Sequence, residues 1–264
     1  MGKPSLRYRL LRSWALRSRE VQWVLRRMES AVESWTGTVL VRTLRDSEKE
    51  ALSIDLYGAS FRPENDHDGL YAWEQEWFER RLPPPPASIL VGAAGSGREA
   101  SALRNLGYDV HAFEPSAPAF QLCQRTLGAE TVDQASYQDL VATVLRGKST
   151  RLRLARDAEF DAVLLGWGSF GHVLRPADRL DLLRACDRVA PGGPILLSLF
   201  EPKAGATANG TIYTPWGGFL ARTTVEELER HAKALKRELI ASLRSPSSYA
   251  TFAPVRTSAD RNTR

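Results

Sequence analysis

The chain has 264 residues, of which 43% are hydrophobic and 25% charged. This composition is ordinary for a soluble globular protein, and the length suffices for one buried α/β domain plus an accessory segment. No window holds 18 uninterrupted apolar residues, which excludes a transmembrane span, and arginines interrupt the apolar core that a signal peptide needs. We therefore expect a cytoplasmic protein.

Positive charge is concentrated at the N-terminus. Residues 1–30 carry eight Lys or Arg and two Glu, whereas the whole chain has a net charge of only +5. The spacing of apolar residues predicts one helix over residues 5–35, which ends at Thr36-Gly37. Its apolar stripe consists of Leu10, Trp14, Val21, Leu25, Met28, Val32 and Trp35. The stripe packs on the domain or on a second copy of the chain; the alternative is an acidic partner or an anionic membrane surface. No recognition motif accompanies the charge, so nucleic acid is not the expected partner.

The segment that follows is mixed in character. Residues 38–44 are β-branched and predict a strand or an extended connector, and Asp46 or Ser47 begins a helix through Leu56. A polar, glycine-bearing stretch then contains the aromatic residues Tyr57, Phe61, Tyr71, Trp73, Trp77 and Phe78. Within it, Asp66-His67-Asp68 is either a solvated turn or a group that faces substrate. Adjacent residues do not converge on one ion without a sharp bend, so we expect no metal.

Four prolines at 83–86 form a stiff spacer between the N-terminal arm, residues 1–82, and a core over residues 87–256. Residues 88–91 form a short apolar run, typical of a buried parallel strand. A turn over residues 92–97 and a helix that ends at Gly107 follow, and a second strand, residues 108–113, ends at Glu114. Strand, glycine turn, helix, strand and acid together indicate a nucleotide-binding βαβ unit.

Each part of this unit has a chemical reason. Gly95 and Gly97 let the backbone approach a ligand that a Cβ would block, and the helix N-terminus favours an anionic group. Glu114 lies where a carboxylate takes both hydroxyls of a ribose. The ligand is therefore a dinucleotide or S-adenosylmethionine.

Ala93-Ala94-Gly95-Ser96-Gly97 is similar to the G-x-G-x-G turn of class I S-adenosylmethionine-dependent methyltransferases. Residues 85–255 as a whole resemble that family, although the acid that the family carries two residues before the first glycine is Val91 here. The resemblance implies a Rossmann-like, seven-stranded, mostly parallel sheet with helices on both faces. It also implies an N-terminal lid in which Tyr57 reaches the methionine end of the cofactor. The other cofactor-binding residues that it implies are Gly92, Ala93, Gly95, Gly97, Glu114, Pro115, Ser136, Tyr137, Gly166 and Trp167.

The remainder of the chain continues the alternating pattern. We expect helices over 118–127, 180–189 and 225–237, strands over 130–134, 161–167 and 194–200, and a final antiparallel hairpin from 239–243 and 249–255. The glycine-rich stretch 202–218 is predicted to be a loop that covers the substrate side, and residues 257–264 a disordered tail. The basic run 146–156 is a solvated surface or a site for an acidic substrate, and Cys123 and Cys186 are apolar fillers.

His172 follows the central strand 161–167, where imidazole is placed to take a proton from a hydroxyl or amine. The alternative is a histidine that only packs or bonds to backbone. The predicted substrate-binding residues are His67, Trp73, Ser169, Tyr213 and Trp216.

The sequence thus predicts a methyltransferase that uses S-adenosylmethionine and acts on an oxygen or nitrogen of a small metabolite or peptide natural product. Two alternatives stay open. One is an NAD(P)-dependent oxidoreductase, and the other is a non-catalytic cofactor-binding module anchored by its basic N-terminal helix. Residues 5–35 are predicted to mediate the association with a second copy or an acidic partner.

Overall fold

The computed structural model describes residues 6–62, 69–153, 159–199, 206–208, 210–215, 217–244 and 247–255. Three predicted features lie outside these residues: His67 with its flanking aspartates, Trp216, and the C-terminal tail. None of the helices in the described part of the chain has the length and apolar composition to span a bilayer.

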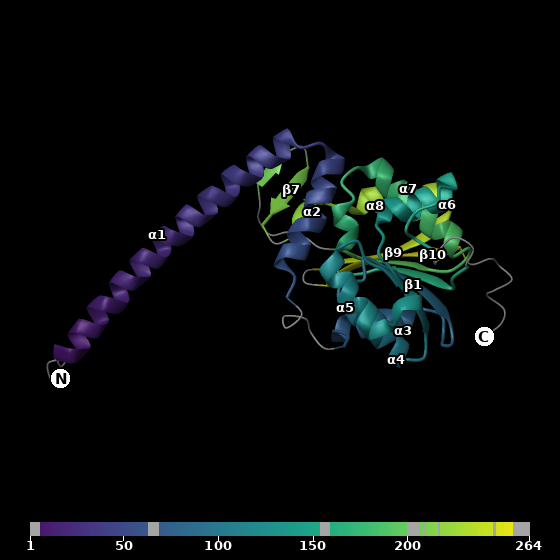
Figure 1. The fold of residues 1–264 in the computed structure, drawn as a ribbon, viewed down its shortest axis with the longest axis horizontal. Coiled ribbons are helices and arrows are strands. Elements are labelled where there is room, and N and C mark those ends of the chain that lie inside the picture. Colours follow the sequence, from purple (N-terminus) through teal and green to yellow (C-terminus); the bar gives the residue numbers. More distant parts are fainter. Residues whose placement is uncertain are drawn as a thin grey trace.

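A seven-stranded sheet forms the centre of the molecule, in the order β3-β2-β1-β4-β5-β10-β9 (Figure 1). The first five strands are parallel, and β9 and β10 form an antiparallel hairpin beside β5. The strands are β1 (Ser88–Gly92), β2 (Asp109–Phe113), β3 (Val132–Asp133), β4 (Ala162–Leu165), β5 (Ile195–Leu199), β9 (Arg237–Arg244) and β10 (Ser247–Pro254). The predicted fold class is confirmed. The strand order reverses between β1 and β4, and a ligand crevice is expected at the carboxyl ends of these strands.

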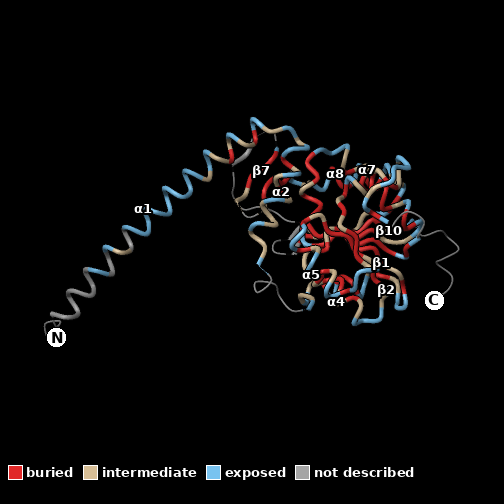
Figure 2. The backbone as a smooth tube through the Cα atoms, viewed as in Figure 1, coloured by how far each residue is buried: buried red, intermediate tan, exposed pale blue. Residues whose placement is uncertain are grey.

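Helices cover both faces of the sheet because the strand residues alternate between two apolar layers (Figure 2). Leu90 of β1 packs with residues of α6 (Tyr137–Arg146), α7 (Pro176–Val189) and α8 (Val225–Leu235). Its neighbour Ile89 packs with residues of α3 (Ala72–Arg81), α4 (Arg98–Asn105) and α5 (Ala117–Leu127) on the other face. Trp77 of α3 is fully buried there, and its Nε1 donates to Thr251 Oγ1 of β10 at 3.0 Å.

The N-terminal helix α1 (Leu6–Thr43) is 38 residues long and extends away from the sheet (Figure 1). The predicted helix end at Thr36-Gly37 and the extended connector 38–44 are wrong, because the helix continues through both. A single glycine costs only about 1 kcal/mol in a helix, and Gly37 and Val41 are buried against the body of the molecule. Helix α2 (Asp46–Ser60) then folds back along the domain.

A second, three-stranded antiparallel sheet stands where the sequence predicts a glycine-rich loop over 202–218. Its strands are β6 (Ala206–Ala208), β7 (Thr211–Thr214) and β8 (Gly218–Ala221), in that order. Tyr213 and Phe219 pack with Val41 of α1 and Leu174 in a separate apolar cluster. The loop prediction is wrong for these residues because the run from 211 to 213 is buried, and burial of a β-branched and aromatic segment favours a strand over a loop.

Candidate cofactor and methyl-transfer site

The glycine turn lies between β1 and α4, at the carboxyl edge of the sheet. Ala93, Gly95 and Gly97 all have positive φ angles, of 51°, 58° and 90°. This left-handed backbone is strained for residues other than glycine, which explains why two of the three are glycine. The N–H of Ala94 donates to the carbonyl of Phe113 at 3.1 Å, so the turn is tied to the end of β2.

Glu114 is buried at the end of β2 and faces the turn. Its Oε2 accepts the N–H of Gly95 at 2.8 Å, and its Oε1 accepts the N–H of Ser116 at 2.8 Å. Burial raises the pKa of Glu114 to about 7, and the two backbone donors oppose this rise. The structure therefore brings together the predicted acid and the predicted glycine turn.

Tyr57 of α2 lies over the same turn. A Cβ built on Gly95 would stand 3.1 Å from the Tyr57 hydroxyl oxygen, so the tyrosine reaches the point where the backbone is bare. Its ring packs on Phe61, with the ring centroids 5.8 Å apart. The turn, Glu114 and Tyr57 thus come together from three separate segments of the chain.

Ser136 and Tyr137 lie near this edge of the sheet, and their side chains also stabilise the fold. The Ser136 hydroxyl accepts the N–H of Asp139 at 3.2 Å, and the Asp139 carboxylate accepts the N–H of Ser136, which closes the first turn of α6. Tyr137 is buried beneath the turn, where its hydroxyl lies 2.5 Å from Ser169 Oγ and donates to the Gly92 carbonyl at 3.3 Å. Burial raises the pKa of Tyr137. Ser169, predicted to bind substrate, is likewise buried in this pair.

His172 lies at the end of a short 3₁₀ helix, Ser169–His172, that follows β4. Its Nδ1 lies 2.9 Å from the carbonyl oxygen of Phe219 in β8. A carbonyl only accepts, so Nδ1 carries the proton and Nε2 keeps a lone pair. Burial lowers the pKa of His172 below 6.5 and keeps the ring neutral at neutral pH. The histidine is therefore in the protonation state that a general base requires.

The side of the site next to β4 contains a charged cluster that the sequence analysis missed. Arg98 pairs with both carboxylate oxygens of Glu74, at 2.6 Å each. The carboxyl of Glu99 lies against Gly166 and accepts a hydrogen bond from the backbone of Trp167. Its buried Oε1 has no hydrogen-bond partner among the described residues, and Arg98 Nη2 lies 3.5 Å from it. Burial raises the pKa of Glu99 to about 8; Arg98 opposes the rise and the carboxyl of Glu74 adds to it.

Two aromatic rings enclose this cluster from outside. Trp167 has a φ of 47° and is largely exposed, and its indole stacks on Tyr71 with the centroids 5.5 Å apart. The guanidinium of Arg98 lies 5.0 Å from both ring centroids. Trp167 was predicted as a site residue, whereas Glu74, Tyr71 and Glu99 were not. Glu99 could have been found from the sequence. It lies two residues after Gly97, in a chain that has Val91 at the position where an acid is usual.

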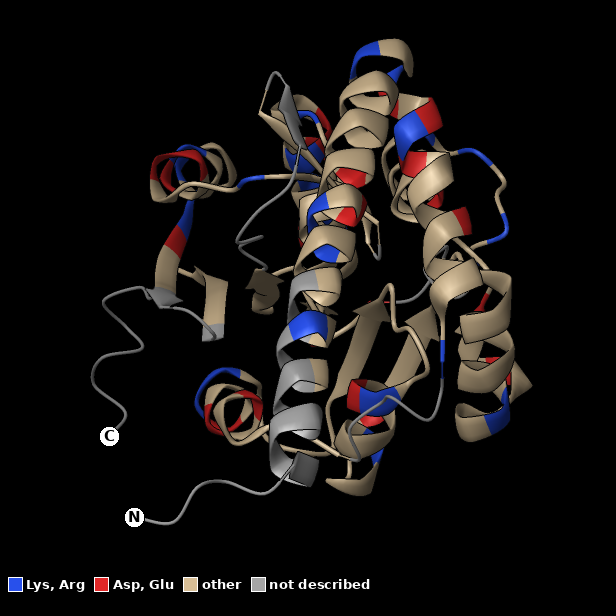
Figure 3. Ribbon diagram, turned by 90° about the vertical axis from the view of Figure 1, so that its left-hand side faces the viewer, with Lys and Arg blue, Asp and Glu red and all other residues tan. Residues whose placement is uncertain are grey.

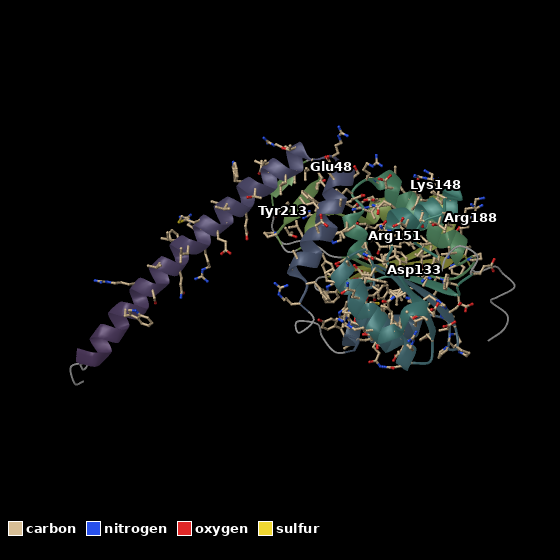
Figure 4. The ribbon with its side chains drawn as sticks, in the orientation of Figure 1. Glu48, Asp133, Lys148, Arg151, Arg188 and Tyr213 are labelled. Carbon is tan, nitrogen blue, oxygen red and sulfur yellow. The ribbon has the colours of Figure 1, made fainter. Side chains whose placement is uncertain are left out.

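Two predicted substrate-binding residues have packing roles in the structure. Trp73 stacks on Trp77 and Tyr249, with ring centroids 6.1 and 6.3 Å apart. Tyr213 is buried against Phe219 on the side of α1, at a centroid distance of 5.3 Å (Figure 4). A role in substrate binding stays a prediction for both residues. The described part of the basic run, residues 146–153, is anchored through Arg153, whose Nε donates to Asp133 at the end of β3 at 2.9 Å.

Comparison with known proteins agrees with this geometry. Residues 90–197 match the family model described as a methyltransferase domain. This stretch runs from β1 to β5 and includes the turn, Glu114 and His172. No curated protein sequence matches the chain.

Solved structures share the fold at low sequence identity. A S-adenosylmethionine-dependent methyltransferase from Leishmania major has a TM-score of 0.54 and 14% identity, over 78% of this chain and 82% of that one. Magnesium protoporphyrin IX methyltransferase from Synechocystis, with bound S-adenosylmethionine, has a TM-score of 0.53 and 12% identity, over 80% and 98%. The CcbJ methyltransferase from Streptomyces caelestis has a TM-score of 0.50 and 15% identity, over 75% and 94%.

The sheet order, the glycine turn and the matched domain define a class I methyltransferase fold. Residues 90–197 are similar to the methyltransferase domain family, and the solved structures that share the fold include S-adenosylmethionine-dependent methyltransferases. These matches support the predicted family and cofactor over the oxidoreductase alternative.

Proposed function

We propose that this enzyme transfers the methyl group of S-adenosylmethionine to an oxygen or nitrogen of a small metabolite or peptide natural product. The observation that carries the proposal is the contact of Glu114 with Gly95, beneath the hydroxyl of Tyr57. When bound, the cofactor supplies an activated methyl group on a sulfonium. The residues of the chain bind it, orient the acceptor and take up a proton.

Two features of the site fit this cofactor. The bare backbone at Gly95 leaves room that a Cβ would fill, and Glu114 offers carboxylate oxygens to a ribose. The buried Oε1 of Glu99 lacks a hydrogen-bond donor, and a carboxylate at the β4 side of the turn suits the ammonium of the methionine moiety. Once it is deprotonated, Glu99 supplies the negative charge that Val91 does not.

The acceptor side is formed by Trp167, Tyr71 and His172. Exposed aromatic faces favour a partly apolar acceptor and stabilise positive charge close to them. Methyl transfer depends above all on alignment, and the neutral His172 takes the proton that the attacking hydroxyl or amine loses. The proposal includes the predicted lid role of Tyr57, and it assigns α1 to association with a second copy or an acidic partner.

Calorimetric titration tests the proposal, with S-adenosylmethionine, S-adenosylhomocysteine and NAD as ligands. We expect the two adenosyl compounds to bind and Glu114→Ala to weaken both by about 30-fold, because it removes charged hydrogen bonds. Glu130→Ala, an exposed carboxylate between α5 and β3, is the control and should bind like wild type. Binding of NAD alone, or equal affinity in the two variants, would contradict the proposed site.

A further inference from the structure

Helix α1 carries an apolar seam that the described part of the chain leaves uncovered. The seam residues are each between 41% and 70% exposed, in a helix that projects away from the sheet. They are Trp14, Val21, Leu25, Met28, Val32, Trp35 and Val39. In the described part of α1, the charged positions form short bands between uncharged stretches of the helix (Figure 3).

The spacing of the seam residues is 7, 4, 3, 4, 3 and 4. Alternating steps of 3 and 4 give a period of 3.5 residues, which is the a/d pattern by which two helices pair as a coiled coil. From Trp14 to Val39 the seam runs for about 37 Å, at 1.5 Å per residue. A narrow, straight seam of this length matches another helix of the same kind.

The seam also points away from the body of the molecule at the end of α1 that touches it. Gly37 and Val41 are buried against the small sheet, whereas Trp35 and Val39 are exposed. Helical positions two residues apart point about 200° apart, so the seam and the docked face are opposite sides of one helix. A second helix therefore fits on the seam without displacing the domain.

The distribution of residues favours a helix over a membrane as the occupant. A membrane-bound helix gathers its aromatic residues on one broad apolar face. Here Trp23 stands on the face opposite the seam, where the guanidinium of Arg27 lies 4.4 Å from its ring centroid. The other exposed apolar residues form the two-position seam of a coiled coil, with Val24 at its flank.

We propose that α1 pairs with α1 of a second copy of this chain in an antiparallel coiled coil. Residues 7–24 carry five arginines and one acid, Glu20, for a local charge of +4, whereas residues 25–43 carry three arginines with Glu29 and Glu33, for +1. A parallel pair would set the two +4 segments against each other, whereas an antiparallel pair sets each against a +1 segment that contains two acids, which lowers the repulsion. This assignment narrows the association proposed for α1 to a second copy of the chain, and it stands if the proposed methyl transfer fails.

A chain of contacts connects α1 to His172 in the active site. Val41 packs in one cluster with Phe219. The Phe219 carbonyl accepts from His172, and its N–H donates to Ser53 of α2 at 2.9 Å. A paired α1 therefore supports the strand that holds the histidine.

Light scattering of the full chain, combined with size-exclusion chromatography, tests the pairing. We expect wild type to have twice the 29.4 kDa of one chain. The double variant Leu25→Glu, Met28→Glu should be a monomer, because it places four carboxylates in the seam of a dimer. Its matched control, Trp23→Glu with Ser30→Glu, adds the same charge on the opposite face and should remain a dimer. S-adenosylmethionine binding and circular dichroism verify that both variants are folded.

Other outcomes would overturn the proposal. A monomeric wild type, or a dimer that persists in the Leu25→Glu, Met28→Glu variant, excludes pairing through the seam. A monomer that sediments with phosphatidylserine vesicles identifies a membrane surface as the occupant.

Cysteine cross-linking tests the orientation. Full overlap of antiparallel seams places position 18 opposite position 35, so a mixture of Ser18→Cys and Trp35→Cys chains should form a covalent heterodimer. Cross-linking of Ser18→Cys to itself would instead show a parallel pair.

Discussion

The main sheet and the accessory region, made of α1, α2 and β6 to β8, are held together by different forces. Two continuous apolar layers enclose the main sheet, and its central strands are fully buried. The accessory region has a small apolar cluster, which Leu174 of the main domain joins, and polar contacts at Arg179, His172 and Gln138 link the region to the main domain. The main sheet is thus held by packing, whereas the position of the accessory region depends on a small apolar cluster and single hydrogen bonds.

Arg179 is the strongest of these contacts and carries the largest expected effect. It is buried in α7, donates to the carbonyls of Val173 and Ala221 at 2.7 Å each, and pairs with Glu227 at 3.0 Å. Arg179→Met should lower the free energy of unfolding by about 3–5 kcal/mol, because it leaves the Glu227 carboxylate without its guanidinium. Chemical denaturation measures this loss.

Two matched variants separate the buried pair from general damage to α7. Arg184→Met removes an exposed arginine from the same helix, paired with Asp181 at 3.1 Å, and should cost less than about 1 kcal/mol. The double variant Arg179→Met, Glu227→Leu should recover part of the stability. If Arg179→Met and Arg184→Met proved equally stable, the joint between the two regions would lie elsewhere.

A variant of His172, which is hydrogen-bonded to β8, tests whether the contact with the accessory region contributes to the chemistry. His172→Asn keeps a donor near the Nδ1 position for the Phe219 carbonyl but removes Nε2, so turnover should fall by about 100-fold with unchanged cofactor affinity. S-adenosylhomocysteine release with the best acceptor from a small-molecule screen gives the rate, and calorimetry gives the affinity. Ser53→Ala breaks the neighbouring bond to Phe219 and keeps the imidazole, so it controls for displacement of β8. Unchanged turnover in His172→Asn would make the histidine structural.

The same contrast explains what could be predicted from the sequence. The strands at Ser88, Asp109, Ala162 and Ile195 are buried apolar runs between glycine turns, and local patterns suffice to place them. The approach of Tyr57 to Gly95 depends on how α2 folds back, which no local pattern encodes. The continuation of α1 past Gly37 and the strands β6 to β8 depend on contacts between distant segments. Tertiary packing there overrides the local preference of glycine and β-branched residues.

The role of Glu99 in the site could not be predicted from the local sequence either, because it depends on contacts with the distant residues Gly166 and Glu74. Its pKa is raised from 4.5 to about 8, so the folded state holds the proton more tightly than the unfolded state. The contribution of Glu99 to stability is then fully present below pH 4.5 and is lost as the pH rises through about 8. Glu99→Gln mimics the neutral acid and should be more stable than wild type at high pH, by on the order of 2 kcal/mol.

Thermal unfolding of both proteins, at low and high pH and with and without S-adenosylmethionine, checks this prediction. A carboxylate that receives the cofactor's ammonium should make the cofactor stabilise wild type more than Glu99→Gln at high pH. Equal stabilisation of the two proteins would leave Glu99 as a structural residue of the Arg98 cluster.

The smallest effect on stability is expected at Ser136. Its side chain caps helix α6 and is also predicted to contact the cofactor. Ser136→Ala should lower the free energy of unfolding by about 1 kcal/mol, because the N–H of Asp139 loses its acceptor. Thr224→Ala removes the equivalent cap of α8, where the hydroxyl accepts from Glu227 at 3.3 Å, and should cost a similar amount. Both losses belong to the fold, so the difference in S-adenosylmethionine affinity between the two variants isolates any contact of Ser136 with the cofactor. A loss of affinity in Ser136→Ala alone supports that contact, and equal affinities would restrict Ser136 to its capping role.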